Sequence, residues 1–199
     1  MTNKVDVNLA AVILAAGESR RFDGIKQLAD IGGISLINRV IAQYPQANIS
    51  DVWVVLGASA DVIAVQLPDG VRIIKTAQWQ QGMGASLAYA ITTLAKANYT
   101  HVFIGLGDLV ALNSDDINAY IKRSEQYPQH IIATEYSHGA GVPAIFPQAD
   151  FADLMALQGD KGAKSLLQQN SHRVKLLECD NARVDIDTQQ QWQHWLQQS

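Results

Sequence analysis

The sequence is poor in cysteine: Cys179 is the only one among 199 residues. A single cysteine excludes an intrachain disulfide and a cysteine cluster for zinc or iron–sulfur, so we expect this side chain to serve packing. The five histidines are scattered without the spacing of metal ligands, and we expect them at surface or partly buried positions. The sequence therefore predicts neither a disulfide-stabilised scaffold nor a zinc site.

Long hydrophobic runs and an excess of positive charge are also missing. The first eight residues are polar, and the apolar run that begins at Leu9 is too short to span a bilayer or serve as a signal peptide. The net charge of −4 does not indicate a nucleic-acid or anionic membrane partner. With 48% hydrophobic and 17% charged residues, the chain is predicted to form one enzyme-sized cytoplasmic domain over residues 1–199.

The most informative stretch is the loop over residues 14–28, LAAGESRRFDGIKQL, which follows the apolar run 9–13. Ala15, Ala16 and Gly17 have little or no side chain, so the backbone can approach a ligand closely there. Successive backbone N–H groups in such a turn form an anion-binding concavity. Two arginines and a lysine in the same loop add cations that suit phosphate oxygens. The loop therefore predicts a cradle for nucleotide phosphates, with a plain strand-to-helix turn as the alternative.

Two better-known phosphate loops are excluded by spacing. A Walker loop requires its second glycine to be followed at once by lysine, but Gly24 is followed by Ile25. A dinucleotide fingerprint requires a third glycine three positions after the second. The runs Gly82-Met83-Gly84 and Gly105-Leu106-Gly107 both lack it. The predicted cradle is thus of a third kind.

Short β-branched runs alternate with longer patterned segments along the chain, which predicts strands joined by crossover helices. Such crossovers build a mostly parallel α/β sheet that is covered on both faces, with a ligand crevice at the carboxyl ends of its strands. The loop 15–26 and Asp108 both follow strands of this kind. We expect strands at 12–15, 52–56, 71–74, 102–106, 131–134 and 142–146, helices at 35–44, 60–66, 84–97, 115–124, 151–157, 163–168 and 189–196, and closing segments at 174–178 and 184–187.

The loop resembles the signature of the GT-A-like nucleotidyltransferases, Leu-Ala-Ala-Gly-x-Ser-x-Arg-Met-Gly-x-x-Lys, and in particular of the molybdenum-cofactor cytidylyltransferases. Similar runs continue at 81–87, 106–108, 141–143, 159–164 and 184–188. The resemblance implies a single-domain, three-layer, Rossmann-like (GT-A-like) fold, with a nucleotide-binding half over about residues 9–108 and an acceptor-binding half over about 109–199. Two departures stand out: Phe22-Asp23 replaces Met-Gly in the signature, and Leu109-Val110 follows Asp108 where the family has Gln-Pro.

The resemblance further implies Mg²⁺-dependent transfer of CMP from CTP to the terminal phosphate of molybdopterin, with release of pyrophosphate. Asp108 is the expected metal ligand, since a hard cation takes carboxylate oxygens, although a lone aspartate at a strand end can also be a helix cap. Asp187 matches the position that completes the metal site in related nucleotidyltransferases, and we rank it above Asp185 as the second metal ligand. The alternative is that Asp187 or Thr188 caps the following helix.

Further site residues follow from the same resemblance. We expect Arg21 and Lys26 to bind the β- and γ-phosphates. Arg20 is expected to be exposed to solvent beside them. Gly82 and Gly84 are expected to let the backbone approach the base, and Ser86 to cap a helix and bond a pyrimidine edge. The expected nucleotide-binding residues are Leu14, Ala15, Ala16, Gly17, Lys26, Gly82 and Ser86.

Lys161 and Lys164 are the expected contacts of the acceptor phosphate, with ordinary surface charges as the alternative. A molybdoenzyme is a possible transient client of such an enzyme. One alternative function is nucleotidyl transfer to another small phosphate, on a sugar or an alkyl group. Another is a non-catalytic chaperone that carries the cofactor, against which the intact Arg21, Lys26 and Asp108 weigh.

Overall fold

The computed structural model describes residues 7–198 and contains a seven-stranded sheet in the order β5-β4-β1-β6-β8-β7-β9. All neighbouring strands are parallel except the two pairs that include β8, which runs antiparallel to β6 and β7. The prediction of a mostly parallel α/β sheet is thereby confirmed. The strands are β1 (Leu9–Leu14), β4 (Asp51–Leu56), β5 (Arg72–Lys75), β6 (His101–Leu106), β7 (Ile131–Tyr136), β8 (Gly139–Pro147) and β9 (Val174–Leu177).

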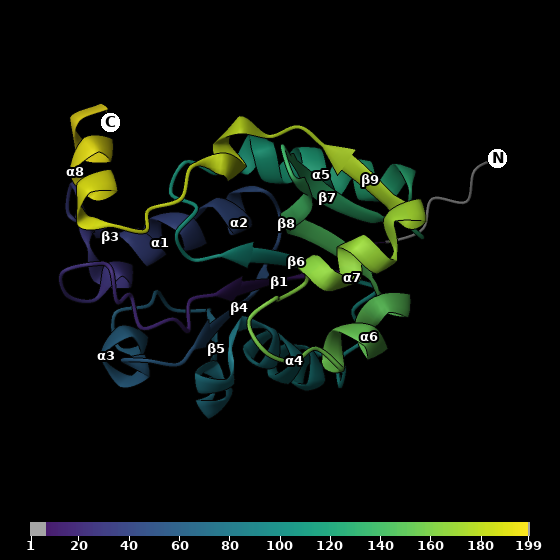
Figure 1. Ribbon diagram of the computed structural model, residues 1–199, viewed down its shortest axis with the longest axis horizontal. Coiled ribbons are helices and arrows are strands. Elements are labelled where there is room, and N and C mark those ends of the chain that lie inside the picture. Colours follow the sequence, from purple (N-terminus) through teal and green to yellow (C-terminus); the bar gives the residue numbers. More distant parts are fainter. Residues whose placement is uncertain (1–6, 199) are drawn as a thin grey trace.

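Helices cover both faces of the sheet and complete three layers (Figure 1). One face packs against α1 (Leu36–Ile41), α2 (Gln43–Gln46) and α5 (Ser114–Gln126), and the other against α4 (Met83–Leu94), α6 (Phe151–Met155) and α7 (Lys164–Gln169). The remaining helices are α3 (Ala60–Ala64) and α8 (Gln189–Gln198). No helix within residues 7–198 has both the length and the apolar character needed to cross a membrane.

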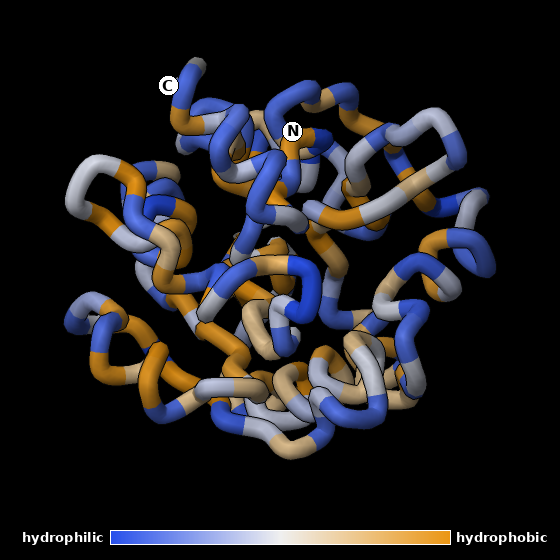
Figure 2. The backbone as a smooth tube through the Cα atoms, turned by 60° about the vertical axis from the view of Figure 1, so that its left-hand side comes forward, coloured by the Kyte–Doolittle hydropathy of each residue, from blue (hydrophilic) through white to orange (hydrophobic). Residues whose placement is uncertain are grey.

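Burial on both faces explains why the central strands are continuous apolar runs rather than alternating ones. In β1, Ala11 and Ile13 contribute to the core under α1, whereas Ala10 and Val12 contribute to the core under α4. All four are fully buried. In Figure 2 the long hydrophobic stretches run along inner segments, and the peripheral turns are largely hydrophilic.

The pairing of β1 with β6 brings two of the predicted site segments together. Leu14 is in register with Leu106, so both strands end at the same edge of the sheet. Beyond this pair the backbone N–H of Gly107 donates to the carbonyl of Leu14 at 2.9 Å. A Cβ at Gly107 would lie 2.9 Å from the Cβ of Ala15, so only glycine fits this approach. Asp108 therefore leaves β6 directly beside the loop that follows β1.

The structure differs from the sequence predictions mainly in short elements. The helix expected over 35–44 is divided into α1 and α2, and the helix expected over 84–97 ends at Leu94. A small hairpin of β2 (Asp30–Ile31) and β3 (Ile34–Ser35) was not predicted. Its two-residue strands are too short to show a hydrophobic period, but Gly32 and Gly33, both at positive φ, are a hairpin-turn signal.

Three aromatic rings, from α2, α5 and β6, form a buried edge-to-face cluster. Phe103 lies edge-on to Tyr44 at 5.4 Å and to Tyr120 at 5.5 Å between ring centroids. The hydroxyl of Tyr120 hydrogen-bonds Thr134 Oγ1 at 2.7 Å. The hydroxyl of Tyr44 is buried against Gly105 with no hydrogen-bond partner, and its burial raises the pKa of Tyr44 above the usual range.

Removing these two hydroxyls is expected to have opposite effects on stability. Tyr44→Phe deletes an unsatisfied buried group, so the free energy of unfolding should stay constant or rise by up to about 1 kcal/mol. Tyr120→Phe deletes a hydroxyl that has a hydrogen-bond partner, so it should lower the free energy of unfolding by about 1–2 kcal/mol. Urea unfolding of both variants measures this difference. Equal destabilisation by the two substitutions would show that the Tyr44 hydroxyl has a partner.

Candidate active site

A cavity of about 740 Å³ opens at the carboxyl ends of β1 and β6. The loop after β1, the start of α4 and the segment after β6 form most of its wall, and Asp160 and Asp187 come from later in the chain. This is the place where open α/β sheets bind ligands. Its lining includes these sequence-predicted residues: Leu14, Ala15, Ala16, Gly17, Arg21, Lys26, Gly82, Ser86, Asp108 and Asp187.

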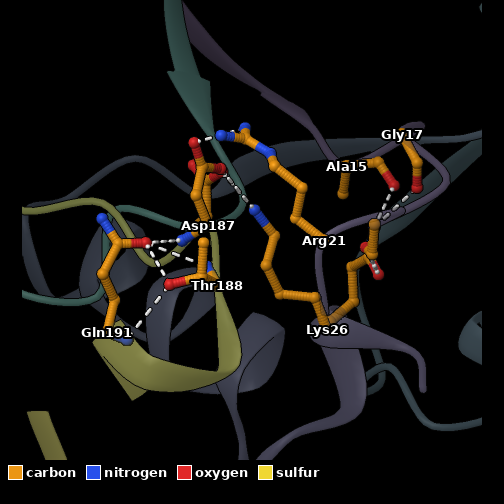
Figure 3. A network of polar contacts seen from close by, with 10 residues as sticks. Ala15, Gly17, Arg21, Lys26, Asp187, Thr188 and Gln191 are labelled. Atoms are coloured by element: carbon orange, nitrogen blue, oxygen red, sulfur yellow. Dashed lines mark hydrogen bonds and ion pairs between the residues drawn. The ribbon is translucent and has the colours of Figure 1, made fainter. Parts of the chain in front are cut away.

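An ion-pair network centred on Lys26 crosses one wall of this cavity (Figure 3). The Lys26 ammonium donates to Asp108 Oδ2 at 2.7 Å and to Asp187 Oδ1 at 3.2 Å. Arg21 donates to the other oxygen of Asp187 at 2.7 Å. The Lys26 side chain is only 12% exposed, so its pairs are screened by water far less than a surface ion pair. The cationic loop and both predicted carboxylates are thus in direct contact.

The path of the cationic loop depends on Gln27, a residue that the sequence analysis missed. Its side chain is 5% exposed and donates to the carbonyls of Ala15 at 3.0 Å and Gly17 at 3.2 Å. The hydroxyl of Ser19, a residue at positive φ, donates to Gln27 Oε1 at 3.2 Å. Gln27 therefore folds the loop back on itself. A polar residue between Lys26 and the apolar Leu28 was a signal, although a neutral amide does not suggest phosphate binding.

Asp108 and Asp187 fit the requirements of a divalent metal site. Asp108 Oδ1 is buried and has no hydrogen-bond partner. This carboxylate oxygen is therefore available to a hard cation, which takes oxygen ligands. Within residues 7–198 no group of three or more histidine, cysteine or carboxylate side chains could hold a metal. Two carboxylates are sufficient for Mg²⁺, because this ion keeps several waters and binds substrate phosphates.

Asp185 is less well placed for the same role. It is absent from the cavity lining, whereas Asp187 is part of it. Desolvation raises the pKa of Asp185, and the charges of Asp187 and Asp108 raise this pKa further. Its carboxyl group therefore lies within electrostatic reach of the Lys26 network without the contacts to Lys26 and Arg21 that Asp187 makes.

Thr188, and not Asp187, caps α8. The backbone N–H of Gln191 donates to Thr188 Oγ1 at 3.2 Å, and Gln191 Oε1 accepts the N–H of Thr188 at 2.8 Å. This reciprocal pair is a capping box, whose Thr-x-x-Gln pattern is visible in the sequence. The alternative that Asp187 serves as the cap is wrong, and its carboxylate is free to bind Lys26 and Arg21.

The two glycines at the start of α4, Gly82 as its N-cap and Gly84 in its first turn, meet another part of the protein. Gly82 adopts φ 109°, and a Cβ there would lie 2.5 Å from the backbone of Gly159. The N–H of Gly84 donates to the Gly159 carbonyl at 2.7 Å. Close approach of the 158–160 loop therefore requires glycine at both positions. Gly82 also lines the cavity, and approach of this backbone to a base stays a prediction.

Ser86 does not cap α4, because the helix begins at Met83 with Gly82 as its N-cap. The prediction that Ser86 is a cap is wrong: its hydroxyl lies in the first turn and donates to the Gly82 carbonyl at 3.3 Å. Ser86 still lines the cavity, as does Trp79 from the preceding turn, which the sequence analysis did not identify. Trp79 packs so closely on Gly57 that a Cβ there would lie 2.4 Å from its indole ring.

The two predicted acceptor contacts lie elsewhere. Lys161 and Lys164 are exposed, Lys164 as the first residue of α7, and neither belongs to the lining of the cavity. Asp160 from the same loop does belong to it. Arg20 is exposed and pairs with Glu18 at 2.6 Å, although it also reaches the cavity lining.

The three-layer α/β fold places a cationic loop against two carboxylates, Asp108 after β6 and Asp187 before α8, and this arrangement matches a nucleotidyltransferase. Residues 11–174 match the family model described as a MobA-like NTP transferase domain, and the chain belongs to this family. Membership supports nucleotidyl transfer as its activity. Asp187 and α8 lie beyond the matched residues.

Solved structures and a curated relative agree with this family. The structure of Rv0371c from Mycobacterium tuberculosis H37Rv superposes with a TM-score of 0.82 at 26% identity, covering 97% of this chain and 99% of that one. A complex of the same protein with manganese gives a TM-score of 0.78 at 24% identity, covering 97% and 100%. The bifunctional protein GlmU of Sinorhizobium medicae (strain WSM419) is 29% identical over 112 residues, which are 55% of this chain and 25% of that protein. The chain thus spans about a quarter of the length of this relative.

Proposed function

We propose that this nucleotidyltransferase transfers CMP from CTP to the terminal phosphate of a molybdopterin-type acceptor, with Mg²⁺ as its cofactor. The observation that carries the proposal is the contact of Lys26 with both Asp108 and Asp187 inside the cavity. This contact supports the proposal because it brings an ammonium group that suits phosphate oxygens next to two carboxylates that suit a metal ion. The choice of CTP and molybdopterin rests on the sequence motifs that resemble the cytidylyltransferases.

In the proposed reaction, an oxygen of the acceptor phosphate attacks the α-phosphorus of CTP. The bond from the α-phosphorus to the bridging oxygen breaks, and pyrophosphate leaves with the electron pair. Lys26 and Arg21 bind the β- and γ-phosphates and stabilise the charge that develops on this leaving group. Asp108 and Asp187 would hold Mg²⁺, which supplies neutralisation of the phosphate charge. Positioning and electrostatics therefore account for the catalysis.

Three side chains of the cavity lining support a pyrimidine in the base site. Ala16 lines the cavity on the side of the signature loop, and its methyl group takes more room there than a glycine would. Trp79 packs closely on Gly57 and lines the same cavity, where it offers an aromatic surface. Ser86 supplies a hydroxyl for the base edge. We keep Lys161 and Lys164 as proposed contacts of the acceptor phosphate, since an acceptor can extend beyond the nucleotide cavity.

Asp108→Asn is expected to retain the fold but to lower kcat by a factor on the order of a hundred or more, because it removes a metal-binding charge. Pyrophosphate release with CTP and Mg²⁺ measures this effect. Asp61→Asn is the matched control, since Asp61 is a 92% exposed aspartate that pairs with Lys75 on the surface. Near-normal activity of Asp108→Asn would remove Asp108 from the metal site.

The protein is expected to prefer CTP to GTP by at least about tenfold in kcat/KM, which corresponds to roughly 1.4 kcal/mol of transition-state binding. Ala16→Gly should reduce this preference, because loss of the methyl group gives a purine more room. Comparison of kcat/KM for both triphosphates in the wild type and the variant tests the idea. Equal use of CTP and GTP by the wild type would reject the cytidylyl assignment and leave nucleotidyl transfer standing.

A further inference from the structure

The C-terminal helix α8 contacts the cationic loop through an aromatic pair. The rings of Phe22 and Trp192 meet edge to face, with centroids 6.3 Å apart and an interplanar angle of 67°. Trp192 is 5% exposed and belongs to the core beneath α1. Phe22 lies next to Arg21, so this pair fixes the loop at a residue adjacent to one of its cations. Phe22 is also where the chain departs from the nucleotidyltransferase signature.

A polar cluster at the start of α8 fixes Asp187 (Figure 3). Gln191 Oε1 accepts hydrogen bonds from the backbone N–H groups of Asp187 at 2.9 Å and Thr188 at 2.8 Å, and from the Thr188 hydroxyl at 3.1 Å. One amide oxygen thereby holds the main chain on both sides of the Asp187 carbonyl. The Asp187 carboxylate then meets Lys26 and Arg21 in a fixed direction.

The helix and the loop are therefore joined by two independent links, one apolar through Trp192 and one ionic through Asp187. Ordering a loop at the moment of binding costs affinity, because each residue that becomes fixed loses conformational entropy. A loop that is already held in the free protein avoids this cost. The links concern the part of the loop that carries both phosphate-binding cations.

We propose that the first turn of α8 is a positioning element for triphosphate binding, in which Gln191 and Trp192 hold the loop that presents Arg21 and Lys26. Neither residue touches the reacting atoms, and both act through Asp187 or Phe22. The identity of the ligand rests on the proposed function. The ordering of the loop by α8 does not, and it can be measured in the ligand-free protein.

Hydrogen exchange of the segment 19–28 tests the ordering directly. Trp192→Ala and Gln191→Ala should each speed exchange in this segment by about tenfold or more, because the closed loop loses a link. Trp192→Phe keeps an aromatic ring and should stay within about threefold of the wild type. Gln190→Ala and Leu196→Ala are the controls, since both side chains are exposed on the same helix. If Trp192→Ala and Gln191→Ala both fold and the segment 19–28 exchanges in them at the wild-type rate, the proposal is overturned.

Kinetics distinguish positioning from a general loss of structure. In Trp192→Ala, KM for CTP should rise about tenfold, while KM for the acceptor and kcat stay within about threefold, and Trp192→Phe should restore KM. Gln191→Ala also releases Asp187, a proposed metal ligand, so it should raise KM for CTP and lower kcat while KM for the acceptor stays within about threefold. Equal losses in all three parameters would overturn the positioning role. If Trp192→Ala does not fold, Gln191→Ala still tests the positioning role. The Gln191 side chain is exposed, so its truncation is expected to leave the core intact. The two claims can fail separately. If the variants exchange faster but the wild-type protein binds no CTP, the proposed function is refuted and the ordering of the loop by α8 is still supported.

Discussion

The site depends on one interaction, the contact of the Lys26 ammonium with Asp108 and Asp187. It joins the loop after β1, the end of β6 and the segment before α8, which are far apart in the sequence. The three side chains are largely shielded from water, so removal of the lysine would leave two carboxylates facing each other at high energetic cost. The geometry of the cavity wall is therefore tied to charge balance as much as to packing.

The same charge balance accounts for a phosphate site on an acidic protein. The chain carries a net charge of −4, and the loop cations Arg21 and Lys26 are paired with aspartates in the ligand-free protein. In the proposed reaction these pairs exchange partners: the cations turn to phosphate oxygens, and the carboxylates to Mg²⁺. Because the donors are already gathered, little reorganisation remains for the moment of reaction. The contact of Trp192 with Phe22 does not depend on these ion pairs and adds to this preorganisation.

Features encoded locally could be predicted from the sequence. Buried parallel strands are continuous apolar runs, so β1, β4 and β6 were found, and with them the positions of the signature loop and Asp108. Roles that depend on distant partners could not. The need for glycine at position 82 arises from a loop more than seventy residues later, and the importance of Gln27 arises from two carbonyls that only the folded loop turns toward it. The helix over 189–196 was predicted, but the contact of its Trp192 with Phe22 depends on the fold of the whole chain and could not be.

The most direct test of the central claim is a screen of nucleoside triphosphates and phosphate acceptors for pyrophosphate release by the purified protein. The account predicts release only when a triphosphate, a phosphate acceptor and a divalent cation are all present, with CTP and a molybdopterin-type acceptor as the best pair. Two results would contradict nucleotidyl transfer at the Lys26 site: pyrophosphate release without any acceptor, or no release with any combination of triphosphate, acceptor and divalent cation.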